Sequence, residues 1–313
     1  MLVCFSSGSK SHLGKVALID SSYNYSFGGF IGQITSNQSI FFKYLFYNLV
    51  SDKYKTYILE LTDGININNL KIKDLQEYKI PPPLLFEQKR IVVILDKVFK
   101  AIDLAKINAE QNLKNVQELF ESYLQNIFEN KNDDWVEKTL NEISDNLDKQ
   151  RIPITKKDRK EGEIPYYGAS GIVDYVEDFL FDENLLCISE DGANLLVRTY
   201  PIAFSINGKT WVNNHAHILR FKKITTQKFI ELYLNSIKLD DFISGMAQPK
   251  LNQTQLNKIP IPFSPMEQQK QIVKKLNTLQ TETKKLETIY QQKLDNLSEL
   301  KKSILQKAFS GEL

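Results

Sequence analysis

The sequence is poor in cysteine and has no long apolar run. Only Cys4 and Cys187 occur among its 313 residues, too few for a disulfide framework or a cysteine-rich zinc site, and this usage fits the reducing cytoplasm. No run of about 18 apolar residues is present, so we predict no membrane-spanning helix. The first five residues are too short for the apolar core of a signal peptide and lack a basic flank, and we expect a strand there.

A strong excess of either charge is also missing. The net charge is +2, with 42% apolar and 25% charged residues, a composition typical of a globular protein that buries a sizeable core. The length allows two ordinary domains. Because the net charge of the whole chain is small, DNA binding would have to depend on local basic clusters.

Catalytic motifs are absent as well. The sequence contains no G-x-G-x-x-G, no H-E-x-x-H and no G-x-S-x-G. The loop with Gly8 and Gly14 is not a phosphate-binding loop, because its glycine spacing differs and Val16 follows Lys15 where Ser or Thr is needed. Residues 81–83, three prolines, are expected to form a stiff turn into a helix rather than a methyltransferase loop. We therefore predict no catalytic residue and no nucleotide site.

Two histidines raise the question of a metal. His215 and His217 alternate along a predicted strand and are expected to point to one face. With no third ligand nearby, packing or DNA contact is favoured over metal binding. We therefore predict no metal ion on this chain.

An internal repeat organises the sequence. Residues 70–128 match residues 251–309 at a constant offset of 181 positions, and both copies contain Leu-x4-Leu-x4-Ile-Pro before a glutamine-containing stretch. About 60 residues in one register are too many for chance, and a repeated structural unit is the usual cause.

The second half of each copy is predicted to be one long helix. Apolar residues recur in the first copy at steps of three and four, at Ile91, Leu95, Val98, Ile102, Ala105, Ala109, Leu113, Val116, Phe120, Tyr123 and Ile127. In the second copy the same register is followed by Ile272, Leu276, Leu279, Thr283, Leu286, Tyr290, Leu294, Leu297, Ile304 and Ala308. Lys301 interrupts the second seam, and Leu300 is expected to cover it. Gly311 can cap the second helix.

Long helices with narrow apolar seams need a partner. We expect the two helices to pair with each other in antiparallel orientation, because the first must deliver the chain to the second globular unit. Two unrelated helices, each packed on its own unit, are the alternative. Residues 135–262 form the complete globular copy, and the counterpart of 135–184 is missing from the front of the chain, so the first unit is expected to lack about 50 residues.

This order of globular unit and long helix, given twice, resembles the specificity subunit of type I restriction-modification enzymes over essentially the whole chain. The marks are sequence segments that occur in family order: residues 5–10 running into 14–17, then 164–171, 189–194 and 213–219. Any one of these segments is a weak signal, and their combination with the duplicated Leu-x4-Leu-x4-Ile-Pro pattern is a strong one.

The resemblance implies a non-catalytic DNA-binding role. In that family each globular unit is a target recognition domain that reads one half of a split site on double-stranded DNA, and paired helices set the spacing between the half-sites. The helices also dock two methyltransferase subunits, which restriction (motor-nuclease) subunits can join. Methyl donor, ATP and magnesium then belong to these partners, so we expect no cofactor here. The shortened first unit departs from the family pattern, which puts reading of the first half-site in question.

Candidate DNA contacts follow from residue chemistry. Basic residues between 149 and 160 suit phosphates, and the tyrosines, glycine and serine of 166–170 suit base edges. Asn207 and Gly208 predict a hairpin turn. Gln248 belongs to a loop that in the family often faces DNA, and its amide can bind adenine. The full set is Ser9, Lys10, Lys15, Lys149, Arg151, Lys156, Lys157, Tyr166, Tyr167, Gly168, Ser170, Asn194, Asn207, Lys209, His215, Gln248 and Lys250. A solvated loop, core tyrosines, a plain hairpin and a helix N-terminal loop are the respective structural alternatives.

We predict an α+β fold with two target recognition domains, the first incomplete, joined by two long antiparallel coiled-coil helices. The expected division is 1–83 for the partial first domain, 84–130 for the first helix, 131–262 for the complete second domain and 263–313 for the second helix. The chain would be a cytoplasmic specificity subunit, and its assembled complex a DNA adenine methyltransferase and site-specific endonuclease. The rivals are a coiled-coil scaffold that does not bind DNA, a catalytic methyltransferase or nuclease, and an inactive or phase-variable fragment.

Overall fold

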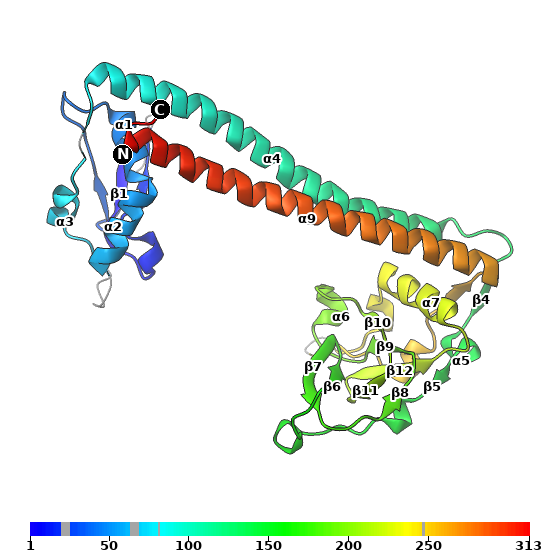
Figure 1. Cartoon of the computed structure of the whole chain (residues 1–313). Helices are drawn as coiled ribbons and strands as arrows, with labels where there is room; N and C mark the ends of the chain where they lie inside the picture. Colours follow the sequence, from blue (N-terminus) through cyan, green and yellow to red (C-terminus); the bar gives the residue numbers. More distant parts are fainter. Residues whose placement is uncertain (20–25, 63–68, 81, 246–247) are drawn as a thin grey trace. The chain divides into compact units, whose positions relative to one another are not determined.

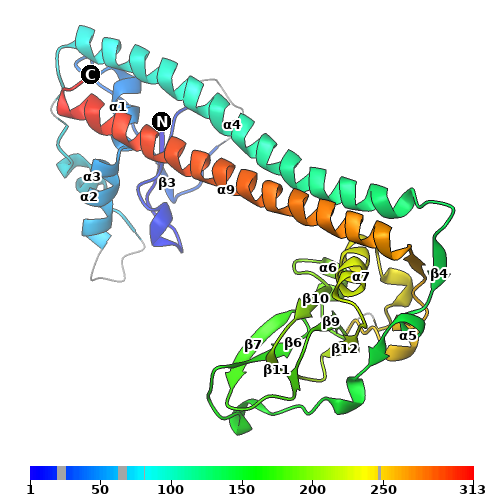
Figure 2. The same ribbon diagram turned by 45° about the vertical axis from the view of Figure 1, so that its right-hand side comes forward.

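The computed structural model describes residues 1–19, 26–62, 69–80, 82–245 and 248–313, so Pro81 of the predicted stiff turn lies outside the described residues. Two compact units make up the chain: Met1–Lys114 together with Thr288–Leu313, and Asn115–Glu287. The two long helices each contribute one part to either unit. Figures 1 and 2 show the helices and strands of both units.

The first unit begins with a small antiparallel sheet. Its strand order is β2-β1-β3, with β1 at Leu2–Cys4, β2 at Val16–Ala17 and β3 at Ile31–Gln33. The strand predicted for the start of the chain is therefore confirmed. Three helices follow, α1 (Phe42–Leu49), α2 (Asp52–Thr62) and α3 (Ile72–Glu77). Val3, Tyr54 and Leu70 lie in the core between sheet and helices, and the Tyr54 hydroxyl donates a 3.0 Å hydrogen bond to the Gly14 carbonyl.

Each predicted long helix is one continuous element. Helix α4 covers Leu85–Glu129 and helix α9 covers Met266–Ser310. Both boundaries of α9 lie 181 positions after those of α4, the offset of the sequence repeat. The short helix α8 (Gln253–Leu256) begins 181 positions after α3, so the repeat has a counterpart in local structure.

Contacts inside each unit show that the helices pair in antiparallel orientation. In the first unit, Leu95 near the start of α4 shares a buried cluster with Leu305 near the end of α9. In the second unit, Leu124 near the end of α4 shares a cluster with Leu276 near the start of α9. The predicted α+β fold with paired long helices is confirmed.

The polar residue in the seam of α9, Lys301, is accommodated differently from our expectation. Leu300 is exposed and does not cover Lys301. Instead the Lys301 ammonium lies 4.8 Å from the centre of the Phe99 ring and 2.9 Å from an Asp103 carboxylate oxygen. A lysine can lay its apolar stem along a seam while its charge reaches a partner. Gly311 does cap the helix: its φ is +83°, and the Glu312 N–H bonds the Lys307 carbonyl.

The second unit contains three sheets. One has the order β10-β9-β12-β5, one β7-β6-β11-β8 and one β13-β4. The strands are β4 (Val136–Lys138), β5 (Asp145–Asn146), β6 (Ile164–Gly168), β7 (Gly171–Val176), β8 (Phe181–Asp182), β9 (Leu185–Ser189), β10 (Ala203–Ile206), β11 (Lys209–Val212), β12 (Ala216–Arg220) and β13 (Ile261–Phe263). The helices are α5 (Leu140–Ile143), α6 (Asn194–Val197), α7 (Ile224–Ser236) and α8. Strand β9 is fully buried between β10 and β12.

The hairpin predicted at Asn207 and Gly208 is wrong. Gly208 does have a positive φ of +65°, as a tight turn requires. However, β10 before the turn pairs with β9, whereas β11 after it pairs with β6 and β8. The turn therefore passes the chain from one sheet to another, because β11 finds its partners in distant segments.

The two globular regions differ in strand content. Among the described residues, the first unit has one three-stranded sheet, and the second has two four-stranded sheets and one two-stranded sheet. The missing segment of about 50 residues and the four-part division of the chain stay predictions. None of the helices in the described parts of the chain combines the length and apolarity needed to cross a membrane.

Candidate nucleic-acid interface

Four loops of the second unit meet at one edge, which we call the loop edge: residues 169–171, 190–194, 213–215 and 248–252. Strands β6 and β11 run parallel, so both end there, and the Asn213 N–H donates to the Tyr167 carbonyl at 3.0 Å. The Glu190 N–H donates to the His215 carbonyl at 2.9 Å, and the Leu251 N–H to the Glu190 carbonyl at 2.8 Å. Main-chain bonds therefore join loops that are far apart in the sequence.

Four predicted DNA contacts gather at this edge with exposed side chains: Ser170, His215, Gln248 and Lys250. Ser170 lies in the turn between β6 and β7. The His215 ring is half exposed, and its Nδ1 lies 2.9 Å from an Asp191 carboxylate oxygen. The Lys250 ammonium, also half exposed, lies 3.2 Å from a Glu190 oxygen. These groups combine a cation, an amide and a hydroxyl on one surface.

Three other candidates of the second unit bond groups of the protein itself instead. Tyr166 is 1% exposed, and its hydroxyl accepts from the Ile154 N–H at 3.1 Å. The Asn194 amide donates to the Tyr200 carbonyl and accepts from the Tyr200 N–H. The Arg151 guanidinium lies 2.7 Å from a Glu190 oxygen and 3.6 Å from an Asp148 oxygen, both on largely buried carboxylates. Tyr166 and Arg151 are satisfied by residues 12 and 39 positions away, whereas the Asn194 amide is used locally, by a residue six positions away.

Gly168 and Tyr167 are also more enclosed than expected. Gly168 is buried, and a Cβ there would lie 2.9 Å from the Val173 side chain, so its lack of a side chain serves packing against β7. The Tyr167 ring is half-buried, packs against Phe204 with ring centres 6.0 Å apart, and burial raises the pKa of its hydroxyl.

The remaining candidates lie away from the loop edge. Asn207 and Lys209 stand at the opposite end of β11, with the Lys209 ammonium 4.7 Å from the centre of the Phe179 ring. Exposed lysines follow the segment after β5, at Lys149, Lys156 and Lys157. The first unit carries Ser9, Lys10 and Lys15 on an exposed loop, where the Ser9 and Ser11 hydroxyls are 2.9 Å apart.

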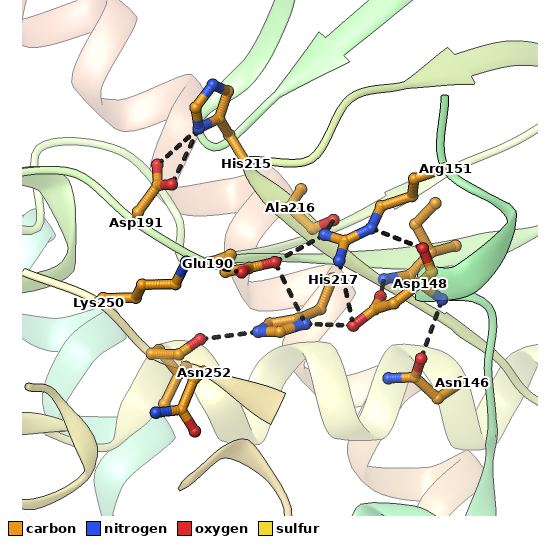
Figure 3. A network of polar contacts seen from close by, with 12 residues as sticks. Asn146, Asp148, Arg151, Glu190, Asp191, His215, Ala216, His217, Lys250 and Asn252 are labelled. Carbon is orange, nitrogen blue, oxygen red and sulfur yellow. Dashed lines mark hydrogen bonds and ion pairs between the residues drawn. The ribbon is translucent and has the colours of Figure 1, made fainter. Parts of the chain in front are cut away.

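Beneath the loop edge lies a buried network of charges (Figure 3). Asp148 Oδ2 is 2.5 Å from His217 Nδ1, and His217 Nε2 is 2.7 Å from the Leu251 carbonyl. Arg151 Nη1 donates to Glu190 at 2.7 Å and to the Ala216 carbonyl at 2.8 Å. Both ring nitrogens of His217 therefore lie within hydrogen-bond distance of oxygen atoms of the protein.

The histidines therefore differ from our expectation. Strand β12 begins at Ala216, so His215 precedes it and the alternation argument does not apply to that residue. Figure 3 shows His215 turned toward Asp191 and His217 toward Asp148. Asp148, Glu190 and Asp191 were not among the candidate site residues predicted from the sequence; their positions at strand ends were the available signal.

The absence of a third metal ligand near His217 was also a wrong expectation. Ligand atoms of Asp148, Glu190 and His217 lie within 4.8 Å of one another. The Arg151 guanidinium, however, bonds Glu190 and lies 3.6 Å from Asp148, and His217 has no lone pair directed at an open position. A guanidinium thus supplies the positive charge that a metal would bring, and the arrangement is that of an ion-pair network.

Burial and the hydrogen-bonding partners shift the pKa of Asp148 in opposite directions. Burial of the carboxyl group favours its neutral form, but hydrogen bonds from His217 and the Ile218 N–H, with the charges of His217 and Arg151, outweigh it and lower its pKa. Asp148 is therefore held as a carboxylate. Burial also raises the pKa of the Cys187 thiol well above its ordinary value, so that thiol is a core group.

Comparison with known proteins identifies the family. The model of the type I restriction modification DNA specificity domain matches residues 2–115 and 132–296. A Haemophilus influenzae protein named as a type I restriction enzyme specificity subunit is 35% identical over 158 residues, which are 50% of this chain and 40% of that protein. The StySPI specificity subunit of Salmonella potsdam is 26% identical, with 100% of this chain and 74% of that subunit covered.

Solved structures share the fold. A chain from a study of complex assembly in a type I restriction-modification system superposes with a TM-score of 0.72 at 18% identity, covering 87% of this chain and 72% of that one. The HsdS subunit of Thermoanaerobacter tengcongensis gives a TM-score of 0.57 at 19% identity, covering 88% of this chain and 72% of that subunit. Together with the family match over both globular regions, these findings show that the chain belongs to the family of type I restriction-modification DNA specificity proteins.

Proposed function

We propose that this chain is the DNA-reading specificity subunit of a type I restriction-modification complex and carries out no chemical step itself. The observation that carries the proposal is the loop edge of the second unit. There, loops from separate strands are tied by main-chain hydrogen bonds and expose Ser170, Gln248 and Lys250. A rigid edge with varied polar groups suits the reading of a defined base sequence.

Each exposed group has a natural partner on a DNA duplex. The Lys250 ammonium would contact a backbone phosphate, which gives affinity and register but little sequence information. The Gln248 amide has the donor and acceptor that adenine presents in the major groove, and the Ser170 hydroxyl can bond either a base edge or a phosphate. The exposed lysines at 149, 156 and 157 would add phosphate contacts beside this edge.

The paired helices would serve two purposes in the complex. Their matching boundaries, 181 positions apart, present two similar surfaces, which suits two copies of one methyltransferase subunit. Their length would set the spacing between two half-sites. Restriction subunits would join this core, and methyl donor, ATP and magnesium would be bound by the partner subunits.

Co-expression with the methyltransferase subunits, followed by mapping of methylated adenines, tests this function. We expect one methylated motif that is absent when the methyltransferase is expressed alone. A bipartite motif would mean that both units read DNA, and a single half-site that only the second does. Partner binding without any methylated motif would reject DNA reading and favour the scaffold alternative.

The non-catalytic assignment has its own test. The purified chain, incubated with methyl donor and duplex DNA, should leave every base unmethylated. Methylation of the DNA by the chain alone would overturn the proposal that partner subunits carry out the chemical steps.

A further inference from the structure

The buried network beneath the loop edge contains more charge than stability requires. The side chains of Asp148, Arg151, Glu190 and His217 are between 1% and 13% exposed. Removing charges from water costs several kcal/mol per ion, and apolar side chains of similar volume often stabilise a core equally well. Such a network is therefore expected where it fixes a particular conformation.

Exposure separates Lys250 from the rest of the network. The Arg151 guanidinium lies inside the protein, 2.7 Å from Glu190 and 3.6 Å from Asp148. Lys250 lies 3.2 Å from Glu190 with its side chain half exposed, so its ammonium can also reach a phosphate outside the protein.

The network connects the segments that form the loop edge. Arg151 follows β5, Glu190 follows β9, and His217 lies on β12. Through His217 Nε2 the network binds the Leu251 carbonyl, and through Glu190 it binds the Lys250 ammonium. Two adjacent residues of the 248–252 loop are thus held by the network, Leu251 through its carbonyl and Lys250 through its ammonium; Figure 3 shows Lys250 and Glu190 among the residues of the network.

We propose that Arg151 and Glu190 are positioning residues for DNA reading: they hold the 248–252 loop so that Gln248 and Lys250 meet the duplex in one fixed geometry. This inference rests on the proposed function. Glu190 orients Lys250 in the absence of DNA, and Lys250 exchanges this partner for a backbone phosphate on binding. Without the network the loop samples several conformations, and discrimination between sequences falls.

A double variant separates positioning from folding. In Arg151→Met with Glu190→Leu, apolar side chains replace the buried pair, which preserves stability in the known cases of this exchange. The matched control is Arg220→Met with Glu183→Leu, which makes the same chemical change at the other end of β9 and β12, where the pair is joined at 2.6 Å and 2.7 Å. Glu190→Gln is a second variant that keeps the side-chain volume and removes the charge that orients Lys250.

The measurement is selection from a library of random-sequence duplexes by the full chain, with thermal melting of each variant. The wild type and the Arg220/Glu183 control should enrich one motif. Both network variants should stay folded and enrich this motif about tenfold less, the effect of losing one good base contact. Equal enrichment by the folded network variants would overturn the inference, as would unfolding of both, since the network would then serve only the fold. A wild type that enriches no motif would instead reject the proposed function.

Discussion

Gln88 and Gln269 are 181 positions apart, both are fully buried, and each joins the start of a long helix to the globular part of its own unit. Gln88 accepts from the Phe41 N–H at 2.8 Å and donates to the Ser39 carbonyl at 3.0 Å. Gln269 accepts from the Thr226 hydroxyl at 2.9 Å and donates to the Ser264 carbonyl at 2.7 Å. The sequence repeat thus preserves, besides the apolar seam, a buried glutamine that bonds the start of each long helix to its globular region. We call this glutamine and its hydrogen bonds the polar joint.

Removing either glutamine should destabilise its unit. Gln269→Ala leaves buried polar groups of Thr226 and Ser264 without their partner, which costs about 1–3 kcal/mol in the free energy of unfolding. Gln88→Ala should lower the free energy of unfolding by a similar amount. Urea unfolding measures the change, and Gln291→Ala, at an exposed position of α9, is the control and should stay within about 0.5 kcal/mol of the wild type. If Gln269→Ala lowered the free energy of unfolding no more than Gln291→Ala does, the buried hydrogen bonds of Gln269 would not stabilise the unit.

Asp148 should make the second unit sensitive to acid. Because its pKa is lowered in the folded protein, the folded state binds its proton more weakly than the unfolded state does. The resulting stability is complete above the ordinary value of 3.8 and is lost as the pH falls through the lower folded pKa.

Unfolding in urea from about pH 6 to about pH 3 tests this dependence. Asp148→Asn should be less stable than the wild type near neutral pH, and the difference should shrink as the pH falls. A difference that stays constant over the whole range would mean that Asp148 is not the titrating group.

Lys250 should account for one phosphate contact. Lys250→Gln is expected to weaken binding to all duplex sequences and to reduce the slope of log K against log salt by about 1. Lys222→Gln is the control, since Lys222 is exposed just beyond the opposite end of β12. Fluorescence anisotropy at several salt concentrations gives both slopes. An unchanged slope for Lys250→Gln would remove this residue from the interface.

The length of the helices should determine the spacing of a bipartite site. Deleting 106–112 from α4 with 292–298 from α9 removes seven residues from segments that oppose each other, as the contact between Asp103 and Lys301 shows. About 10 Å of helix is lost, which corresponds to roughly three base pairs. Methylation mapping should show a spacer shortened by that amount with the same half-sites. An unchanged spacer would reject the helices as the determinant of spacing.

Local sequence patterns were sufficient to predict the two long helices. Steps of three and four recur over about ten turns, and each apolar position adds evidence for one helical face, so α4 and α9 appear at the predicted places. Their antiparallel pairing followed from chain connectivity. The repeat further predicted that both globular regions resemble each other before their helices, and the joints at Gln88 and Gln269 extend that similarity to hydrogen bonds.

Single loop residues were much harder to assign. Tyr166 and Arg151 were candidate DNA contacts because their side chains are polar, yet each is satisfied inside the protein. The reverse holds for Asp148 and Glu190, which were not among the candidates and yet belong to the buried network beneath the loop edge. Whether a polar group faces solvent depends on which distant segment reaches it, and spacing along the chain carries no information on that.

The helical seams, the alternation of globular units with long helices and the duplication could therefore be predicted from the sequence itself. Periodicity and connectivity can be read directly along the chain. The transfer of β11 to a second sheet, the burial of His217 and the meeting of four loops at one edge were decided by tertiary structure. They depend on pairings between strands such as β6 and β11, whose partners lie more than 40 residues apart, and such pairings are selected by packing of the whole unit rather than by any local signal.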